Sequence, residues 1–456
     1  MALSDTDDRP LTLDAMTAWM AEGCKPKSEW LVGAEHEKFG FRLGSHDPVP
    51  YYGDNGIEAL LKGLMRFGWQ GVFEDSDNGP VLIALERNGA NVSLEPGGQF
   101  ELSGAPLETM HQICQETGRH LEEVKTVADE LGLGFLGMGF TPNWRRDQIP
   151  VMPKGRYAIM RAYMPKVGNL GLDMMFRTCT VQANLDFDSE ADMVAKFRMS
   201  LALQPIATAL FANSPFTEGK PNGYLADRAN IWTDTDPDRT GLLDFVFEDG
   251  FGFERYARYA LDVPMYFAKR NGRYLDLAGK SFRDFIDGKL TELSGERATM
   301  KDWADHMTTI FPEVRLKQYL EMRGADSGPW SRICALPALW TGVFYDSAAL
   351  AAAWDLCKHW TAEDRAKLRA DVPRQGLKAV VAGRTAQDVA KDFIAIAREG
   401  LKRRKRLDGG FADETGYLGE IEAIAESGIT PAEHLLDLYH GPWKGDVSRA
   451  FEALAY

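Results

Sequence analysis

Two short segments near the start of the chain carry carboxylates at spacings that favour a shared site. In residues 33–41, which we expect to form a strand, Glu35 and Glu37 lie two positions apart. Strand side chains alternate between faces, so both carboxylates share a face with Phe39 and Phe41. Burying them there is unfavourable unless something positive lies between them. A solvated edge strand is the alternative interpretation.

The second segment, residues 93–104, contains a Pro-Gly-Gly bend between Glu95 and Glu101. The bend can bring these two carboxylates to the same point as the first pair. Several oxygen ligands beside closely approaching glycine backbone are typical of a hard-cation site that handles phosphate. A polar turn explains the second segment alone about as well, but the two segments together favour the cation site.

The bulk composition narrows the classes of protein. The chain has 456 residues, 45% of them hydrophobic, and a formal net charge of −15, which argues against a nucleic-acid-binding surface. No run approaches the roughly eighteen consecutive apolar residues of a membrane span. The first residues are acidic and polar, without an export or import signal. We therefore expect a cytoplasmic protein whose partners include neither nucleic acid nor membrane.

Five cysteines form no C-x-x-C pair and show no metal-ligand spacing, so zinc is not expected. An odd, sparse set in a long chain is typical of reduced thiols.

Several segments of the chain have the sequence pattern of helices. Residues 105–131 carry apolar side chains at helical spacing and start near Pro106, which predicts a long amphipathic helix. Ser189 and Thr430 each precede an acidic residue by three positions, a start signal for two more helices. We expect residues 335–456 to be mostly helical.

The clearest strand is residues 178–187, in which Val181, Ala183 and Leu185 alternate with polar side chains. The polar face suits either solvent or the floor of a cleft, and the neighbouring acidic strands favour the cleft. Strands scattered between helices, without a regular rhythm, predict an α+β fold with a mainly antiparallel sheet. No linker marks a boundary, so we expect residues 1–456 to form one composite catalytic domain, with residues 1–10 as a flexible tail.

Two motifs suggest other functions but lack the right context. Residues 132–137 match the G-x-G-x-x-G dinucleotide fingerprint, yet they follow a long helix, whereas the fingerprint follows a strand and opens a helix. The basic run at residues 402–406 lies at the expected end of a helix, where cations complement the helix dipole. A nicotinamide site and a nucleic-acid patch are therefore both disfavoured.

Later segments supply arginines suited to anions. Residues 228–241 offer Arg228, Trp232 and Arg239 in a loop-like stretch. Glu313 with Arg315, and Glu321 with Arg323, are spaced two apart, so each pair shares a strand face; surface ion pairs are the alternative. Acids for Mg²⁺, arginines for anions and no P-loop together favour metal-dependent phosphoryl transfer from ATP.

Taken together, the segments resemble glutamate–cysteine ligase of the plant and proteobacterial type. The resemblance covers about residues 10–445 and is carried by residues 33–41, 94–106, 136–144, 153–157, 170–187, 203–223, 231–241 and 310–339. It implies a glutamine synthetase-like carboxylate–amine ligase fold, in which helices surround a curved, mainly antiparallel β-sheet funnel. It also implies ATP-dependent joining of the γ-carboxylate of L-glutamate to the amine of L-cysteine through γ-glutamyl phosphate, the first step of glutathione biosynthesis.

The resemblance also implies roles for individual residues. Mg²⁺ would be held by Glu35, Glu37, Glu95, Glu101 and Glu321. Glu37, Glu101 and Arg323 would be catalytic, with Arg323 at the transferring phosphate, and Lys38 and Arg239 would reach the nucleotide. The candidate substrate-binding residues are Arg228, Trp232, Arg177, Thr178, Gln182 and Asn184.

Plant members of this family carry two regulatory cysteine pairs. Cys114 and Cys334 stand where one pair would be, whereas Leu277 and Glu292 occupy the positions of the other. A Cys114–Cys334 disulfide can therefore form, and two reduced, buried thiols are the alternative.

Two other functions remain open: a related ligase that joins glutamate to a different amine, and a non-catalytic sensor of glutamate or nucleotide. For the ligase, the partners would be L-glutamate, L-cysteine and ATP, and the protein would be a monomer or a homodimer.

Overall fold

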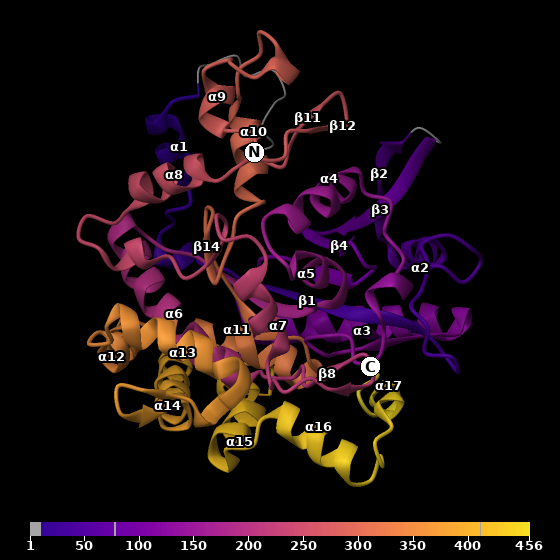
Figure 1. Ribbon diagram of the computed structural model, residues 1–456. Coiled ribbons are helices and arrows are strands. Elements are labelled where there is room, and N and C mark those ends of the chain that lie inside the picture. The colour runs from indigo at the N-terminus through magenta and orange to yellow at the C-terminus, as the bar shows by residue number, and fades with distance from the viewer. Residues whose placement is uncertain (1–10, 77–78, 411) are drawn as a thin grey trace.

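The computed structural model describes residues 11–76, 79–410 and 412–456, so the tail predicted for residues 1–10 lies outside the described residues. A large sheet of nine strands runs through the described part of the molecule (Figure 1). Every pairing in it is antiparallel, as predicted. Its strands, in spatial order, are β14 (Val314–Leu316), β15 (Leu320–Asp326), β7 (Thr180–Leu185), β1 (Val32–Arg42), β5 (Phe100–Ser103), β4 (Ala90–Leu94), β3 (Gly79–Arg87) and β2 (Gln70–Ser76), with β6 (Leu133–Leu136) also paired to β1.

Smaller two-stranded pairs lie outside this sheet. They are β8 (Phe216–Thr217) with β9 (Lys220–Pro221), β10 (Thr240–Gly241) with β13 (Phe311–Pro312), β11 (Phe267–Arg270) with β12 (Arg273–Asp276), and β16 (Val380–Val381) with β17 (Arg384–Thr385).

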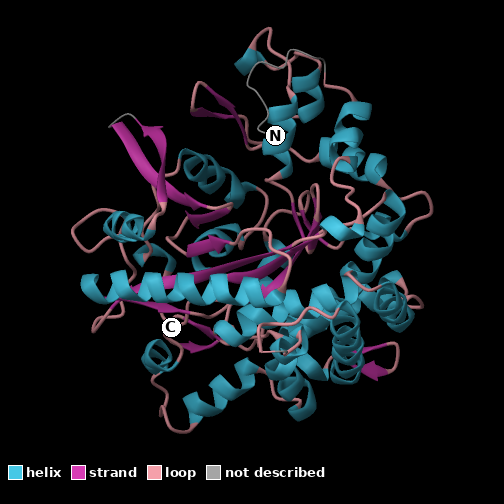
Figure 2. Ribbon diagram, turned by 180° about the vertical axis from the view of Figure 1, so that it is seen from behind, coloured by secondary structure: helices cyan, strands magenta, loops and turns pink. Residues whose placement is uncertain are grey.

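Three helices pack against one face of the sheet: α3 (Met110–Leu131), α6 (Glu190–Leu210) and α11 (Trp330–Phe344). Figure 2, which views the molecule from behind, shows a long helix in front of the strands. Val32 and Ala34 of β1 and Val181 and Ala183 of β7 are buried in the core between this face and the helices. Phe39, further along β1, belongs to a second large core. One strand therefore contributes to both cores.

Shorter helices lie near the opposite face, because their residues line one cavity together with residues of β1 and β5; Figure 1 labels α4 and α5 in this region. These are α4 (Gly155–Tyr163), α5 (Gly171–Arg177) and α7 (Asp227–Ile231). The remaining helices are α1 (Leu13–Ala21), α2 (Ile57–Leu64), α8 (Phe253–Asp262), α9 (Phe282–Ile286), α10 (Met300–Met307), α12 (Ser347–Cys357), α13 (Ala362–Gln375), α14 (Ala386–Arg404), α15 (Gly419–Ser427), α16 (Pro431–His440) and α17 (Ala450–Ala453). The chain beyond residue 335 is mostly helical, as predicted.

The long helix predicted for residues 105–131 begins later, at Met110. Thr109 caps it with a complete capping box, which the apolar spacing upstream of Thr109 had obscured. Leu107 is instead extended and forms a β-bridge with Val32. The start signals at Ser189 and Thr430 are confirmed, since both side chains accept a backbone N–H at the helix start.

The glycine motif and the basic run both have the structures that their sequence context predicted. Residues 133–136 form strand β6 directly after α3, so the glycine pattern does not open a helix. The basic run closes α14, where Arg403 and Arg404 pair with Asp346 and Glu414.

In the described part of the chain, no single helix is both long and apolar enough to cross a membrane. Helices α11 and α12 meet that requirement only when joined, and they bend by 98° at their junction.

Candidate active site

Neighbouring strands bring four of the predicted carboxylates together. The register places Glu37 of β1 opposite Glu101 of β5, and Glu35 lies two residues earlier on the same face of β1. Glu321 approaches from β15, which pairs with the far edge of β7. Residues opposite each other in antiparallel strands point to the same face, so these side chains converge.

A tight bend between β4 and β5 adds Glu95. Gly98 has a φ of 84°, which a glycine adopts without strain, and the Glu95 N–H donates to the Gln99 carbonyl at 2.9 Å. The Gln99 side-chain amide donates to the carbonyls of Met175 (3.1 Å) and Thr178 (3.0 Å), which ties the bend to α5. The bend predicted from Pro-Gly-Gly is therefore confirmed.

All five carboxylates line one cavity of about 240 Å³ between the sheet and the helices α4, α5 and α7. Five cationic side chains line it as well: Arg156, Arg228, Arg315, Lys317 and Arg323. Three of the cationic side chains act on Glu321, so the pKa of Glu321 is shifted differently from those of the other acids.

Three of the carboxylates repel one another. Burial, then the charges of Glu321 and Glu101, raises the pKa of Glu35 to about 7. Burial and the charges of Glu95 and Glu101 raise the pKa of Glu37 well above its usual range, and burial and Glu95 also raise the pKa of Glu101. This part of the cavity therefore favours bound positive charge.

Glu321 is in the opposite situation. Burial alone would raise its pKa, but Arg315, Lys317 and Arg323 hold the pKa well below its usual range. Arg315 grips both carboxylate oxygens, at 2.6 and 2.8 Å, and Arg323 Nη1 donates to Oε2 at 2.8 Å. Arg315 does not form the surface ion pair with Glu313 that was the alternative interpretation. The cross-strand register sets Arg315 opposite Glu321, and Glu313 pairs with Arg369.

Two predicted substrate residues present unpartnered donors. Arg228 and Trp232 both line the cavity. Arg228 Nη2 donates to the Arg323 carbonyl at 3.0 Å, while Arg228 Nε and Trp232 Nε1 are buried without a partner among the described residues. Buried donors of this kind are costly unless a ligand accepts from them.

Three further predicted residues lie in or beside the cavity. Thr178 and Gln182 line it, and Gln182 Oε1 accepts from Arg323 Nη1 at 2.7 Å. Asn184 follows Gln182 on the same face of β7, beside the cavity, and donates to Glu35 Oε1 at 2.7 Å.

Lys38 does not reach the cavity. It follows Glu37 on β1, so strand alternation turns it to the opposite face. There it is fully buried, with Nζ 2.9 Å from His120 Nε2 and 3.3 Å from the Phe100 carbonyl. The expectation that Lys38 contacts the nucleotide is therefore contradicted.

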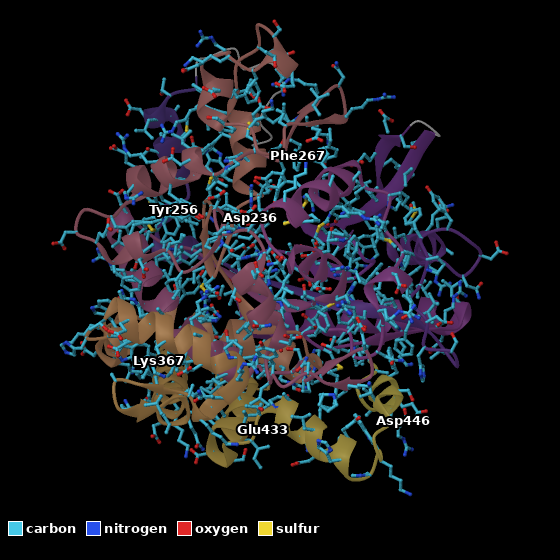
Figure 3. The ribbon with its side chains drawn as sticks, in the orientation of Figure 1. Asp236, Tyr256, Phe267, Lys367, Glu433 and Asp446 are labelled. Atoms are coloured by element: carbon cyan, nitrogen blue, oxygen red, sulfur yellow. The ribbon has the colours of Figure 1, made fainter. Side chains whose placement is uncertain are left out.

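Arg239 and Arg177 also point elsewhere. Arg239 is fully buried and donates to Asp236, labelled in Figure 3, at 2.6 Å. Arg177 pairs with Asp173 at 2.7 Å and with Glu218 at 2.8 Å. Neither side chain lines the cavity. Acids close to each arginine hold it in place, and the sequence pattern did not indicate this.

Three cationic residues line the cavity although they were not predicted as site residues: Arg156, Arg315 and Lys317. Arg156 falls in residues 153–157, a segment quoted only for its resemblance, and Lys317 follows Arg315 in the turn between β14 and β15. Pairing these two strands in register would have placed Arg315 beside Glu321.

The cysteine pair lies behind the sheet. Cys114 of α3 and Cys334 of α11 are both buried and carry free thiols. Burial, then a hydrogen bond with Cys334, raises the pKa of the Cys114 thiol. The two side chains are therefore in contact, but no disulfide joins them here.

The comparisons with known proteins indicate one family over nearly the whole chain. The family model of glutamate-cysteine ligase family 2 (GCS2) matches residues 31–453. Chloroplastic glutamate–cysteine ligases from Nicotiana tabacum and Arabidopsis thaliana are 58% and 57% identical, and each match covers 98% of this chain and 83% of the relative. The glutamate–cysteine ligase B of Oryza sativa subsp. japonica is 56% identical, with 98% and 88% covered.

A solved structure shares the fold. The crystal structure of glutamate–cysteine ligase from Francisella tularensis in complex with AMP superposes with a TM-score of 0.56 at 12% identity. The superposition covers 93% of this chain and 89% of that one. The predicted α+β carboxylate–amine ligase fold is therefore confirmed.

The expected cytoplasmic location is contradicted, because these close relatives are named as chloroplastic proteins. The prediction rested on the acidic, polar first residues and on sparse thiols. Net charge and cysteine content do not determine to which compartment a protein is delivered.

Proposed function

The chain belongs to glutamate-cysteine ligase family 2, and from this premise we propose how its acidic cavity joins glutamate to cysteine with ATP. The enzyme is a glutamate–cysteine ligase, as its relatives at 55–58% identity over nearly the whole chain indicate. The observation that carries the proposal is the convergence of five carboxylates, three of them with raised pKa values, in one cavity.

Mg²⁺ fits this donor set. Glu35, Glu37, Glu95 and Glu101 offer hard oxygen ligands in a place where their own repulsion favours a cation. In the described part of the chain, no three acidic, histidine or cysteine side chains form a complete cage for one ion. Mg²⁺ does not need one, since it usually takes one or two carboxylates and completes its shell with water and substrate phosphates. When bound, it would neutralise phosphate charge during transfer.

Glutamate would be held at the Arg228 end of the cavity. The buried donors Arg228 Nε and Trp232 Nε1 lack partners, and a substrate carboxylate can accept from both. This placement leaves the γ-carboxylate free to extend toward the acidic cluster.

In the first step, a γ-carboxylate oxygen of glutamate would attack the γ-phosphorus of ATP, and the bond to the ADP oxygen would break. Arg323 is positioned for the transferring phosphoryl group, because Gln182 and Glu321 both fix its guanidinium. Fixed positive charge where negative charge develops lowers the barrier without reorganisation.

In the second step, the amine of cysteine would attack the γ-carbonyl carbon of γ-glutamyl phosphate. The carbon–oxygen bond to phosphate breaks, and the attacking nitrogen loses a proton as the amide forms. Burial beneath the helices limits competing hydrolysis of the acyl phosphate.

The direct test measures phosphate release with ATP, Mg²⁺ and glutamate, with and without cysteine, alongside the mass of the product. Cysteine-dependent phosphate matched by γ-glutamylcysteine supports the proposal. Phosphate without the dipeptide indicates a different acceptor. No phosphate under either condition contradicts the ligase function.

We also propose that a two-electron oxidant, such as a low-molecular-weight disulfide that is reduced to two thiols, can convert the Cys114 and Cys334 thiols to a disulfide, since the two thiols already touch. Their burial in a reduced state is the alternative. Peptide mapping without reduction, after mild oxidation, separates the two: a crosslinked peptide containing both cysteines supports the bridge, and its absence contradicts it.

A further inference from the structure

The cavity contains a second buried arginine donor, and it lies away from Arg228. Arg156, near the start of α4, lines the cavity, and its Nε is buried without a partner among the described residues. The described residues place no carboxylate in ion-pair contact with Arg156, whereas Arg315 and Arg323 are both paired with Glu321.

Hydrogen bonds to the sheet show the order of the two arginines in the cavity. Lys154 and Tyr157, the residues near Arg156 in sequence, both donate to the Leu94 carbonyl of β4. Arg228 instead donates to the Arg323 carbonyl of β15. Strands β1 and β5, which carry Glu35, Glu37 and Glu101, lie between β4 and β15 in the sheet, so the acidic cluster lies between Arg156 and Arg228.

Apolar side chains line the same cavity as Arg156. Met160 lies one turn further along α4, and Met174 and Met175 come from α5. Phe267 of β11, which is labelled in Figure 3, adds to this apolar wall of the cavity lining. Thioethers and an aromatic ring make a soft surface that suits a short thiol side chain.

We infer that Arg156 binds the carboxylate of the acceptor amino acid, with its side chain against Met160, Met174, Met175 and Phe267. This inference rests on the proposed function, which requires two α-carboxylates in one cavity, one from glutamate and one from the acceptor. Arg228 can hold the first. Arg156 supplies the second anion site on the other side of the acidic cluster, so the acceptor amine faces the activated γ-carbonyl.

The same wall sets side-chain preference. A hydroxyl has no partner on a surface of methionine and phenylalanine, whereas an ethyl group fits as a methylene thiol does. The wild-type enzyme should therefore use 2-aminobutyrate within about tenfold of cysteine and disfavour serine by about 100-fold. Serine as good an acceptor as 2-aminobutyrate would overturn the apolar assignment.

The decisive experiment compares cysteine with cysteamine, which keeps the amine and thiol but lacks the carboxylate. In Arg156→Met, we expect kcat/KM for cysteine to fall about 10- to 100-fold, the loss of one charge-assisted bidentate contact. The value for cysteamine should change less than about threefold, because cysteamine never makes that contact. The KM values for glutamate and ATP should also stay within about threefold.

The matched control is Arg161→Met, which removes an exposed arginine of the same helix and should leave all these constants unchanged. Equal losses with cysteine and cysteamine would assign Arg156 a structural role and overturn the inference. A selective rise in the KM for ATP would assign it to phosphate instead and also overturn it.

A second variant tests the inference if Arg156→Met does not fold. Arg156→Lys keeps the charge, so cysteine selectivity over cysteamine should fall by less than in Arg156→Met; a full collapse with normal thermal denaturation contradicts the assignment. Wild-type enzyme that forms no γ-glutamylcysteine would refute the proposed function itself. Wild-type turnover with an unchanged acceptor ratio in Arg156→Met would refute only this subsite.

Discussion

Individual carboxylates of the cavity are placed for function at a cost in stability. Burial and repulsion between Glu37, Glu95 and Glu101 raise the pKa values of Glu37 and Glu101. The folded chain therefore gains stability from any change that removes one of these charges, whereas phosphoryl transfer by the proposed mechanism would lose a cation ligand. Stability and activity should move in opposite directions at these positions.

For Glu101→Gln we predict a kcat lower by about 100-fold or more, equivalent to about 2.7 kcal/mol of transition-state stabilisation. The same variant should be about 1 kcal/mol more stable in the presence of a chelator, since a repelled, buried charge has gone. Steady-state kinetics and urea unfolding in EDTA check both. A variant that is both less stable and fully active would contradict the assignment of Glu101.

Arg323 is expected to act on the reaction more than on the fold. We predict that Arg323→Ala lowers kcat by about 100- to 1,000-fold, since a fixed donor to the transferring group is lost. The matched control is Arg398→Ala, which breaks a pairing with Glu422 outside the cavity and should leave kcat unchanged. An unchanged kcat in Arg323→Ala would remove Arg323 from the catalytic set.

Among the secondary-structure elements, β1 was the most predictable. A strand was predicted for residues 33–41, and β1 extends one residue further at each end. The shared face of Glu35 and Glu37 follows from period-two geometry, and the structure confirms it. The same rule, applied to Lys38, would have turned that residue away from the nucleotide. Alternation along a strand therefore predicts on which face of the sheet a side chain lies, but not which residues it contacts on that face.

Features that depend on several elements could not be predicted. The register between β15 and β7 shifts between Met322 and Ala325, at Arg323 and Gly324. No sequence pattern announces such a bulge, although it bends a strand and re-aims side chains. Likewise, the distant partners of Arg177 and Arg239, namely Glu218 and the Pro264 carbonyl, lie in turns whose position the sequence does not reveal.

Helix α10 provides a test of acid stability. His306 is buried, its ring stacks on Phe282 at 4.6 Å, and its Nε2 lies 2.8 Å from the Ala260 carbonyl. Burial lowers its pKa from 6.5 to about 4. Between these values the unfolded chain binds a proton that the folded chain does not, so stability falls as the pH falls through this window.

We predict that this one group removes about 3 kcal/mol of unfolding free energy between pH 6.5 and pH 4. In His306→Phe, which keeps a ring against Phe282, the dependence on pH should be shallower by that amount. Urea unfolding at several pH values measures it. Parallel pH profiles for the variant and the wild type would show that His306 does not carry the effect.

At the level of the whole molecule, both large cores share the central sheet. Val32 and Ala34 of β1 pack in one core, and Phe39 and Phe41 of the same strand pack in the other. Neither core can lose its packing without exposing residues of this strand. The single composite domain remains a prediction, as does the choice between monomer and homodimer.

We therefore predict one cooperative transition in differential scanning calorimetry, with the calorimetric enthalpy equal to the van't Hoff enthalpy. A variant that weakens β1 in one core, such as Phe39→Ala, should lower the single transition temperature without splitting it. Two resolved transitions, each sensitive to mutations in a different core, would show separate domains.

The repulsion inside the cavity also couples catalysis to the lifetime of the protein. Ligands that bind only the folded chain stabilise it in proportion to the logarithm of their concentration. Cations and nucleotide that quench the clustered acids should therefore slow proteolysis, and their depletion should hasten it. The abundance of this ligase would then follow the supply of its own co-substrates, without a dedicated regulator.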